Sequence, residues 1–336
     1  MGGLALKQFE VVRLEKREYD LVIQEITQKL NDRFGSDIRF DVIPSYLNKK
    51  DFGDLDIIYT SKIEILDNLI QLINPKEFIK NGPVLSIVYQ FNDKKFQVDF
   101  IRVKDDSYDF SLNYYSNNDL GNLIGRIFHK MGFKFGHDGL SYVVRDFTIN
   151  TKVLGTLLVS TNFKEVLEFG DYHNYENQIF NELEDIFNYV TTSKYFNKTI
   201  FLLENRNHIS RVRDKKRPTY MKFLKFTENR EFDNNFNFKD KEIFRKEILE
   251  QIFVRFPDFK ERYNQLLIQI EHKRMISEKF NGNLVKDLTG LEGKTLGYFI
   301  KFLLSWFEHN KGIDNYSSEE IKTIIVLLFT SQKWNI

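Results

Sequence analysis

Two aspartates, Asp54 and Asp56, stand at the start of an apolar run over residues 55–59 that is typical of a β-strand. Side chains two residues apart on a strand point to the same face. Two carboxylates on one face repel each other unless they are solvated or share a cation. Oxygen-rich pairs suit Mg²⁺, which keeps water and phosphate oxygens as its other ligands. The spacing therefore predicts a metal site that handles a nucleoside triphosphate.

A third acid, Asp99, lies inside a second predicted strand over residues 96–103. This strand follows another over 84–91, and the short polar segment between them predicts a hairpin. Two interpretations stay open. Asp99 either lies on the solvated face of a half-buried strand, or adjacent strands bring it beside Asp54 and Asp56 as a third carboxylate.

The segment that follows the hairpin combines a predicted helix with conspicuous polar residues. Apolar residues at helical spacing predict a helix over 118–131, with Asn122, Arg126 and Lys130 recurring every four residues on the opposite side. These three residues form either a solvated face or a row that contacts a nucleotide and a nucleic-acid backbone. The preceding pair, Tyr114-Tyr115, either stacks on a base or sugar or belongs to the core.

Several of these motifs together resemble a known family. Ser45, the run Gly53-Asp54-Leu55-Asp56, Asp99 and the segment from Tyr114 to Leu140 resemble the DNA polymerase β superfamily of nucleotidyltransferases. The last segment is especially similar to family X DNA polymerases, with their aromatic pair, small-residue turn and helix bearing Asn and Arg. The resemblance covers roughly residues 36–145. The family usually has Gly where this chain has Pro44.

The resemblance implies an α+β fold, with a nucleotidyltransferase mixed sheet flanked by helices. It implies that Asp54, Asp56 and Asp99 are the catalytic carboxylates and bind Mg²⁺ or Mn²⁺, two ions per site. Asp99 would lie nearest the attacking 3′-hydroxyl, and two metals would stabilise the attacking and leaving oxygens. The candidate nucleotide-binding residues are Ser45, Lys49, Lys50, Gly53, Tyr114, Tyr115, Asn118 and Asn122. For Lys49 and Lys50, solvated positions in a loop are the alternative.

The second half of the chain is predicted to be mostly helical, over 163–169, 176–190, 243–256 and 259–276. An acidic segment is followed by a basic one over 206–225 with interleaved aromatics, a composition suited to phosphates and stacked bases. The candidate nucleic-acid-binding residues are Arg126, Lys130, Arg211, Arg213, Lys215, Lys216 and Arg217. The alternative is a solvated face that pairs with the acidic helix. The tail over 280–307 loosely resembles the closing helical domain of CCA-adding and bacterial poly(A) polymerase enzymes, which implies a grip on RNA such as tRNA.

Length and composition bound the remaining possibilities. The chain has 336 residues, a formal net charge of +1 and no cysteine, which excludes disulfides and cysteine metal sites. We expect two domains, a catalytic domain over 1–160 with a thumb-like helix and hairpin, and a helical domain over 161–336. The longest wholly apolar run, 324–329, is too short to cross a bilayer, and the first residues do not have the pattern of a secretory signal. The protein is expected to act inside the cell, in the cytoplasm or nucleus, without a membrane partner.

These patterns predict an Mg²⁺-dependent nucleotidyltransferase that uses a nucleoside triphosphate to extend a nucleic-acid 3′ end. One alternative keeps the chemistry and transfers the nucleotide to a protein or small molecule. Another is a catalytically silent nucleic-acid-binding relative. The sequence leaves open the base added, the choice between DNA and RNA, the need for a template and the oligomeric state.

Overall fold

The computed structural model describes residues 5–146, 152–238 and 240–331. The chain divides into two compact units, Met1–Pro257 and Asp258–Ile336. The boundary expected at residue 160 is therefore not where the compact units separate. The reason lies in helix α4 (Leu120–Met131), which packs against the later helices α6 (Leu183–Val190) and α9 (Lys241–Arg255) and so ties the middle of the chain to its first part.

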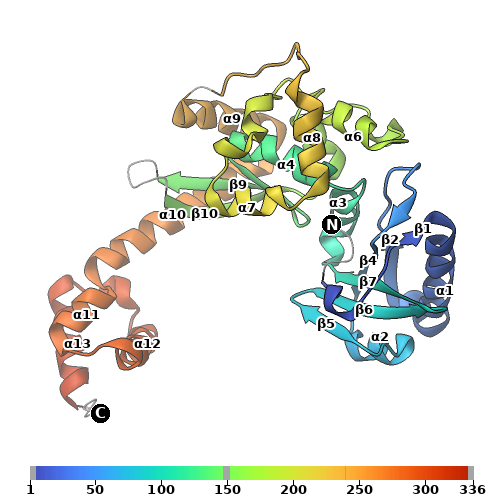
Figure 1. The fold of residues 1–336 in the computed structure, drawn as a ribbon. Coiled ribbons are helices and arrows are strands. Elements are labelled where there is room, and N and C mark those ends of the chain that lie inside the picture. The colour runs from blue at the N-terminus through green and yellow to red at the C-terminus, as the bar shows by residue number, and fades with distance from the viewer. Residues whose placement is uncertain (1–4, 147–151, 239, 332–336) are drawn as a thin grey trace. The chain divides into compact units, whose positions relative to one another are not determined.

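A five-stranded mixed sheet forms the first part of the larger unit, with strand order β2-β4-β7-β6-β5 (Figure 1). Its strands are β2 (Ile38–Val42), β4 (Asp54–Ser61), β5 (Phe78–Asn81), β6 (Val84–Phe91) and β7 (Lys94–Arg102). Strands β4 and β7 run parallel, and the other pairs are antiparallel. The predicted hairpin of β6 and β7 is confirmed. The predicted α+β class, with a mixed sheet, flanking helices and a helical C-terminal region, is confirmed as well.

One face of this sheet is covered by α1 (Lys16–Phe34) and α2 (Leu66–Ile73). In α1, a capping box of Glu15 and Glu18 satisfies the first backbone amides, and Gly35 follows with φ 50°. Its residues Val22, Ile26 and Leu30 recur every four positions and are fully buried against the sheet. The apolar residues of 16–34 fall at helical spacing and by themselves predict this helix, which the structure confirms.

The opposite face of the sheet is partly covered by α3 (Tyr108–Tyr115), a helix that the sequence analysis missed. Ile58 of β4 and Ile101 of β7 pack there with Tyr108. Since side chains alternate along a strand, Asp54 and Asp56 point to the same face as Ile58, away from α1 and α2. The acids thus lie on the side of the sheet that α3 leaves partly open.

Helix α4 begins the second part of the larger unit and packs on a three-stranded sheet of order β10-β9-β8. These strands are β8 (Phe133–Gly136), β9 (Gly139–Asp146) and β10 (Lys152–Ser160), and a two-stranded pair joins β1 (Leu14–Glu15) to β3 (Asp51–Phe52). The helix predicted over 118–131 is confirmed as α4, although it begins two residues later than predicted.

The rest of the larger unit is helical. Its remaining helices are α5 (Phe163–Phe169), α7 (His208–Lys215) and α8 (Pro218–Glu228), with short 3₁₀ helices at Lys7–Phe9, Gly35–Asp37, Asp105–Ser107, Tyr175–Asn177, Lys198–Phe201 and Leu203–Asn205. The helix predicted over 176–190 is wrong in its first half. A capping box of Glu182 and Asp185 starts α6 only at Leu183.

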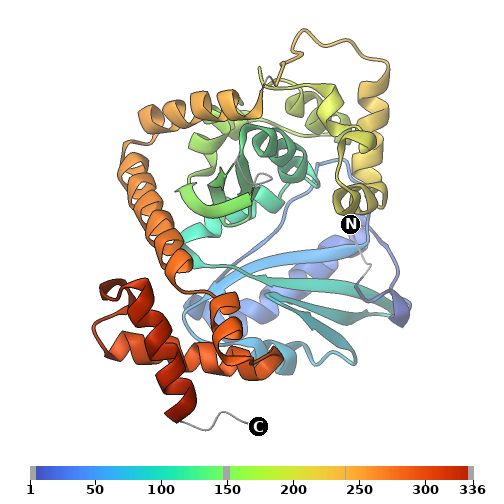
Figure 2. The ribbon, with the colours of Figure 1, turned by 90° about the vertical axis from the view of Figure 1, so that its left-hand side faces the viewer.

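The smaller unit consists of helices around its own apolar core (Figure 2). They are α10 (Pro257–Lys279), α11 (Gly282–Thr289), α12 (Gly293–His309) and α13 (Ser318–Ser331), with a short 3₁₀ helix at Ile313–Asn315. Phe299, Leu303 and Phe307 from α12 pack with Ile321 and Ile325 from α13. Within the described residues of both units, none of the helices has the length and apolarity needed to span a membrane.

Candidate metal and nucleotide site

Asp54, Asp56 and Asp99 lie together on one face of the mixed sheet. In the parallel pairing of β4 with β7, Asp56 is directly opposite Asp99, and Asp54 is opposite Gln97. One carboxylate oxygen from each aspartate lies within 4.8 Å of the others. Asp99 is therefore beside the other two acids, as the second interpretation of the strand pattern predicted, and the cluster could hold a metal ion.

The cluster carries a strong electrostatic cost. Burial raises the pKa of Asp56 well above its ordinary value, and the charges of Asp54 and Asp99 raise it further. Burial also raises the pKa of Asp99 to about 6, against the lowering effect of hydrogen bonds from Ser86 and Gln97. A divalent cation would relieve the repulsion among three half-buried carboxylates that lie this close together.

Gln97 holds the carboxylate of Asp99 in place. Its Nε2 donates to both Asp99 oxygens at 3.0 and 2.9 Å, and its Oε1 accepts from the backbone N–H of Leu6 at 3.2 Å. The two contacts agree on the amide orientation, since one needs a donor and the other an acceptor. The sequence analysis missed Gln97. Its position two residues before Asp99 was the available signal, because it places a polar side chain on the same strand face.

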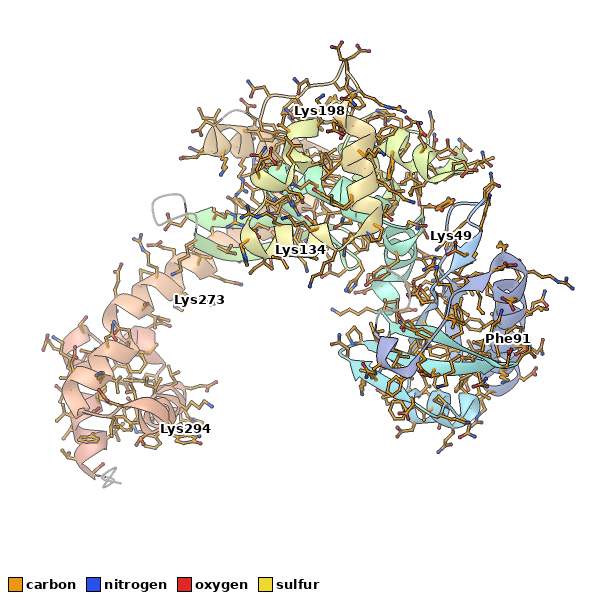
Figure 3. The ribbon with its side chains drawn as sticks, viewed as in Figure 1. Lys49, Phe91, Lys134, Lys198, Lys273 and Lys294 are labelled. Carbon is orange, nitrogen blue, oxygen red and sulfur yellow. The ribbon has the colours of Figure 1, made fainter. Side chains whose placement is uncertain are left out.

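The loop from Ile43 to Gly53 connects β2 to the acids and carries four of the predicted nucleotide contacts. Lys49, labelled in Figure 3, lies with Nζ 4.5 Å from the centre of the Phe52 ring. Burial lowers the pKa of Lys49, while the charges of Asp54 and Asp56 favour its protonated form. A half-buried ammonium in the field of the acid cluster is placed to meet phosphate charge, which supports the prediction for Lys49.

The positions of the other predicted residues of this loop neither support nor contradict a contact with a nucleotide. Ser45 is half-buried, Gly53 is buried at the start of β4, and Lys50 is exposed. The first half of the loop is fixed at two points, because Pro44 accepts a backbone hydrogen bond from Asn117 at 2.8 Å and Leu47 donates one to Phe180 at 2.9 Å. The first of these bonds joins the loop to the turn between α3 and α4.

The end of α3 carries the predicted aromatic pair Tyr114-Tyr115, and the turn after it carries Asn118. Asn117 and Asn118 both have left-handed backbone angles, with φ 56° and 59°. The Oδ1 atom of Asn118 is buried without a hydrogen-bond partner in the described part of the chain. The Tyr115 ring stacks on His137 with centroids 5.7 Å apart, and burial followed by the charges of Tyr114 and Asp56 raises its pKa. Tyr115, at the end of α3, therefore lies close enough to Asp56 to sense its charge, and Asn118 lies on the turn that follows.

Replacing Gly121 by Ala is expected to disturb this turn. An added Cβ would lie 2.3 Å from the Tyr114 carbonyl oxygen, so α3 and α4 would have to separate. Overpacking of this kind costs about 1–3 kcal/mol of unfolding free energy, measurable by denaturant unfolding. The matched control is Gly297→Ala in α12, where a Cβ meets no described atom within 4 Å. Equal stability of Gly121→Ala and the control would contradict the close approach.

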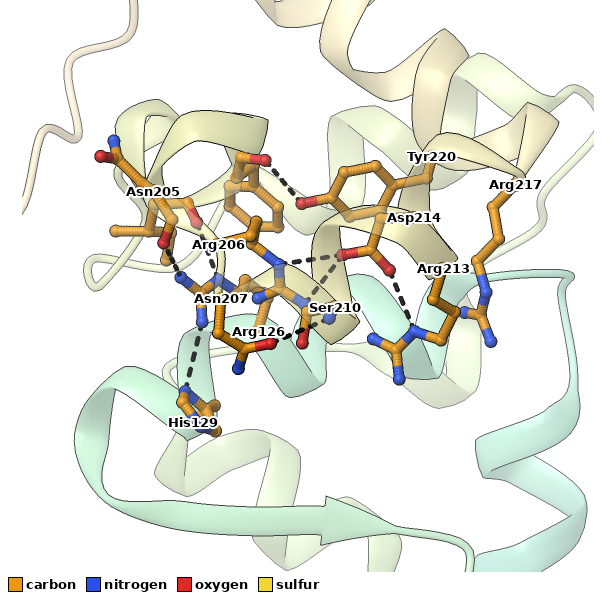
Figure 4. Close-up of polar contacts among 12 residues, drawn as sticks. Arg126, His129, Asn205, Arg206, Asn207, Ser210, Arg213, Asp214, Arg217 and Tyr220 are labelled. Carbon is orange, nitrogen blue, oxygen red and sulfur yellow. Dashed lines mark hydrogen bonds and ion pairs between the residues drawn. The ribbon is translucent and has the colours of Figure 1, made fainter.

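Arg126 does not face outward as the resemblance implied. The side chain is only 6% exposed, and its Nε donates to the Ile200 carbonyl at 2.7 Å, with a longer contact from Nη2 to the Asn205 carbonyl at 3.4 Å (Figure 4). Its position on α4 places it under the segment 200–205, which the sequence pattern of the helix alone does not reveal. Arg126 therefore does not lie on an outward-facing surface, because its guanidinium holds two parts of the chain together.

The other predicted nucleic-acid contacts divide into structural and exposed residues. Arg213 pairs with the buried Asp214 at 3.1 Å, and Arg217 pairs with Asp119 at 3.2 Å. Lys215 and Lys216 are exposed, whereas Lys130 and Arg211 are half-buried. The described ion pairs of this basic segment are therefore local or made to α4's N-terminal end, and they do not involve the acidic helix α6.

The surroundings of His129 predict that the stability of the folded protein depends on pH. Its Nδ1 lies 3.2 Å from Nη1 of Arg126 (Figure 4). Desolvation, with the charges of Arg126, Arg206, Arg245 and Arg145, lowers its pKa from 6.5 to about 4. The folded protein thus keeps His129 neutral where the unfolded chain protonates it, so this contribution to stability is complete above pH 6.5 and is lost as the pH falls toward 4.

The expected measurement is the melting temperature of the wild type and of His129→Gln from pH 7 to pH 4.5. The wild type should lose stability relative to the variant as the pH falls. His129 and His208 are both exposed, so His208→Gln at the start of α7 is the control for the effect of the arginines around His129. A constant difference between wild type and His129→Gln across this range would contradict the assignment.

The geometry thus combines a three-carboxylate cluster, a positioned lysine and a turn with aromatic and amide groups beside the acids. No protein-family model matches the chain, and no curated protein matches its sequence. The function is therefore inferred from the site itself.

Proposed function

We propose that the chain is a divalent-metal-dependent nucleotidyltransferase of the DNA polymerase β superfamily. It would transfer a nucleoside monophosphate from an NTP or dNTP to the 3′-hydroxyl of a nucleic acid. The observation that carries the proposal is the direct pairing of Asp56 with Asp99, which with Asp54 brings three carboxylates within 4.8 Å of one another. In this proposal the five-stranded mixed sheet is the nucleotidyltransferase core.

The donor set fits Mg²⁺ or Mn²⁺, because it consists of carboxylate oxygens whose mutual repulsion a cation relieves. Asp54, Asp56 and Asp99 would hold two ions. When bound, such ions neutralise the charge that develops on the attacking and leaving oxygens. The rest of the site belongs to the chain's own residues.

Asp99 would act on the attacking hydroxyl. Gln97 donates hydrogen bonds to both of its carboxylate oxygens and so fixes the group that would face the hydroxyl proton. In the transfer, a bond forms between the 3′-oxygen and the α-phosphorus. The bond from the α-phosphorus to its bridging oxygen breaks, and pyrophosphate leaves. Asp99 favours the deprotonated form of the hydroxyl in this step.

The triphosphate and nucleoside would lie between the loop and the α3–α4 turn. Lys49 would meet phosphate charge, because its ammonium already lies in the field of Asp54 and Asp56. Asn118 offers an acceptor, Oδ1, that is unused by the described residues and suits a ribose hydroxyl or a base amino group. The Tyr115 ring would pack on the sugar or base.

The acceptor has less structural support than the triphosphate, because the burial of Arg126 removes one argument for nucleic acid. Exposed Lys215 and Lys216 still offer phosphate contacts, and the helical unit Asp258–Ile336 would contribute the grip on RNA that the resemblance of its tail implies. Transfer to a protein hydroxyl is the competing function that the test must include.

The test incubates the full chain with Mg²⁺ or Mn²⁺ and each α-labelled NTP or dNTP singly. The acceptors are tRNA, single-stranded DNA and primed DNA, and the Asp56→Asn variant is the control. We expect a lengthened nucleic acid with the wild type alone. Label on protein without nucleic-acid product would establish the competing function, and no labelled product at all would refute nucleotidyl transfer.

A further inference from the structure

A cationic cavity lies in the second part of the larger unit, apart from the three acids. It has a volume of about 700 Å³ and is lined by α4, the hairpin of β8 and β9, the segment 205–213 and the start of α9. Eight of the described lining residues are Arg or Lys, and none of them is Asp or Glu. A cavity of this size is typical of a small-molecule site, whereas a nucleic-acid track is an open groove.

Arg126 and Lys130 bring like charges together in the cavity. Arg126 donates to backbone carbonyls rather than to a carboxylate, and desolvation together with the charge of Arg206 lowers its pKa to about 10. Desolvation, Arg126 and Lys241 likewise lower the pKa of Lys130. Like charges that disfavour one another inside a cavity are stabilised when an anion binds between them.

The acids near the cavity are already engaged. Asp214 is fully buried and pairs with Arg206 at 2.9 Å and with Arg213 at 3.1 Å. Asp138 pairs with Lys134 at 2.9 Å, and Asp240 accepts from the first amides of α9. These contacts orient several of the cationic side chains. Lys130 and Lys241 remain close enough for their positive charges to repel each other.

The cavity wall is also preorganised. Gly132 ends α4 with φ 103°, and a Cβ there would lie 3.1 Å from Nε of Arg245. The absence of a side chain at Gly132 lets this guanidinium lie against the backbone. Two partly accessible rings, Tyr114 and Phe238, complete the lining and offer surfaces for a base or sugar.

We propose that this cavity binds the clustered phosphate groups of a nucleotide, as a site separate from the three carboxylates. The ligand is a free nucleoside polyphosphate or the phosphorylated end of a nucleic-acid strand, which present the same chemistry. Fixed guanidinium and ammonium groups neutralise it, so binding needs no metal. The site stands whether or not the proposed nucleotidyl transfer is correct.

The test measures binding of inorganic tripolyphosphate and of ATP to the full chain by calorimetry in EDTA. The cavity variant is Lys130→Glu with Lys241→Glu, and the matched control is Lys62→Glu with Lys104→Glu, two exposed lysines outside the cavity. We expect at least a ~10-fold weaker affinity in the cavity variant, because it loses two cationic donors of charge-assisted hydrogen bonds, and no change in the control. Equal affinities in the two variants, or no binding of either probe, would overturn the proposal.

Two further measurements test whether the phosphates bind in the cavity and whether its charge holds them. Asp56→Asn should keep probe binding in EDTA, and its loss would place the ligand at the acids instead. Unfolding curves check that the cavity variant is folded, and the neutral pair Lys130→Gln with Lys241→Gln should show an intermediate loss of affinity. A neutral pair with wild-type affinity would refute a charge-dependent site.

Competition then identifies the source of the phosphates. An oligonucleotide with a terminal phosphate that displaces ATP, when its hydroxyl-ended counterpart does not, supports a strand end as the ligand. Displacement by free nucleotides alone supports a small ligand. Equal displacement by both oligonucleotides would refute recognition of clustered terminal phosphates.

Discussion

Replacing Asp99 by Asn is expected to lower nucleotidyl transfer by at least ~10³-fold, in line with the loss of one preorganised charged group from a phosphoryl-transfer site. The substitution keeps the shape of the side chain and removes one of the three charges that lie within 4.8 Å of one another. It also removes the carboxylate that would favour the deprotonated hydroxyl. The measurement is the single-turnover rate of product formation at saturating triphosphate, with Mg²⁺ and with Mn²⁺.

The control for this prediction is Asp93→Asn, a change at an exposed acid in the turn of the same hairpin. It should leave the rate within about twofold, because an isolated surface charge contributes little. If Asp99→Asn retained full activity, the three-carboxylate mechanism would be wrong. If both variants were inactive, the assay would instead report damage to the β6–β7 hairpin.

The pair Asp54 and Asp56 could be predicted from the sequence because two residues at this spacing on a strand share a face. The strand pattern left the place of Asp99 open, since it depends on the pairing of β7 with β4, and only the family resemblance implied that it joins the pair. The apolar stripe of α1, like the pair, was visible from its spacing alone. Such features depend on the alternation of apolar and polar residues or on a 3.6-residue apolar period, and both patterns are visible within a short stretch of sequence.

The features that could not be predicted from the sequence depend on contacts between segments that are distant along the chain. Arg126 lies on the polar side of a helical pattern, yet the segment 200–205 covers it and accepts its hydrogen bonds. Helix α3 carries both Tyr114 and Tyr115, but it has no apolar stripe long enough to distinguish it from a loop. The cavity likewise brings together residues from 114 to 245, and no local pattern predicts which cations will meet.

Divalent metal is expected to stabilise the folded protein through the same acids. An ion at ten times its dissociation constant would add about 1.4 kcal/mol to the unfolding free energy of the larger unit if it binds the folded state alone. Mg²⁺ and Mn²⁺ should therefore raise the melting temperature of the wild type, and EDTA should reverse the change. This measurement needs no substrate and is independent of the acceptor.

Asp56→Asn should separate the destabilising repulsion among the three carboxylates from their role in binding metal. Without metal, the variant removes a buried carboxyl group whose ionisation Asp54 and Asp99 oppose, so we expect it to be more stable than the wild type by about 0.5–2 kcal/mol, the range common for a single stabilising substitution. With metal, the order should reverse or the difference should vanish, because the variant lacks a ligand. Asp93→Asn, the surface control, should follow the wild type under both conditions. A variant that is less stable without metal and still gains stability from Mg²⁺ would show that Asp56 is a structural acid, since relief of repulsion and loss of a ligand predict the opposite signs.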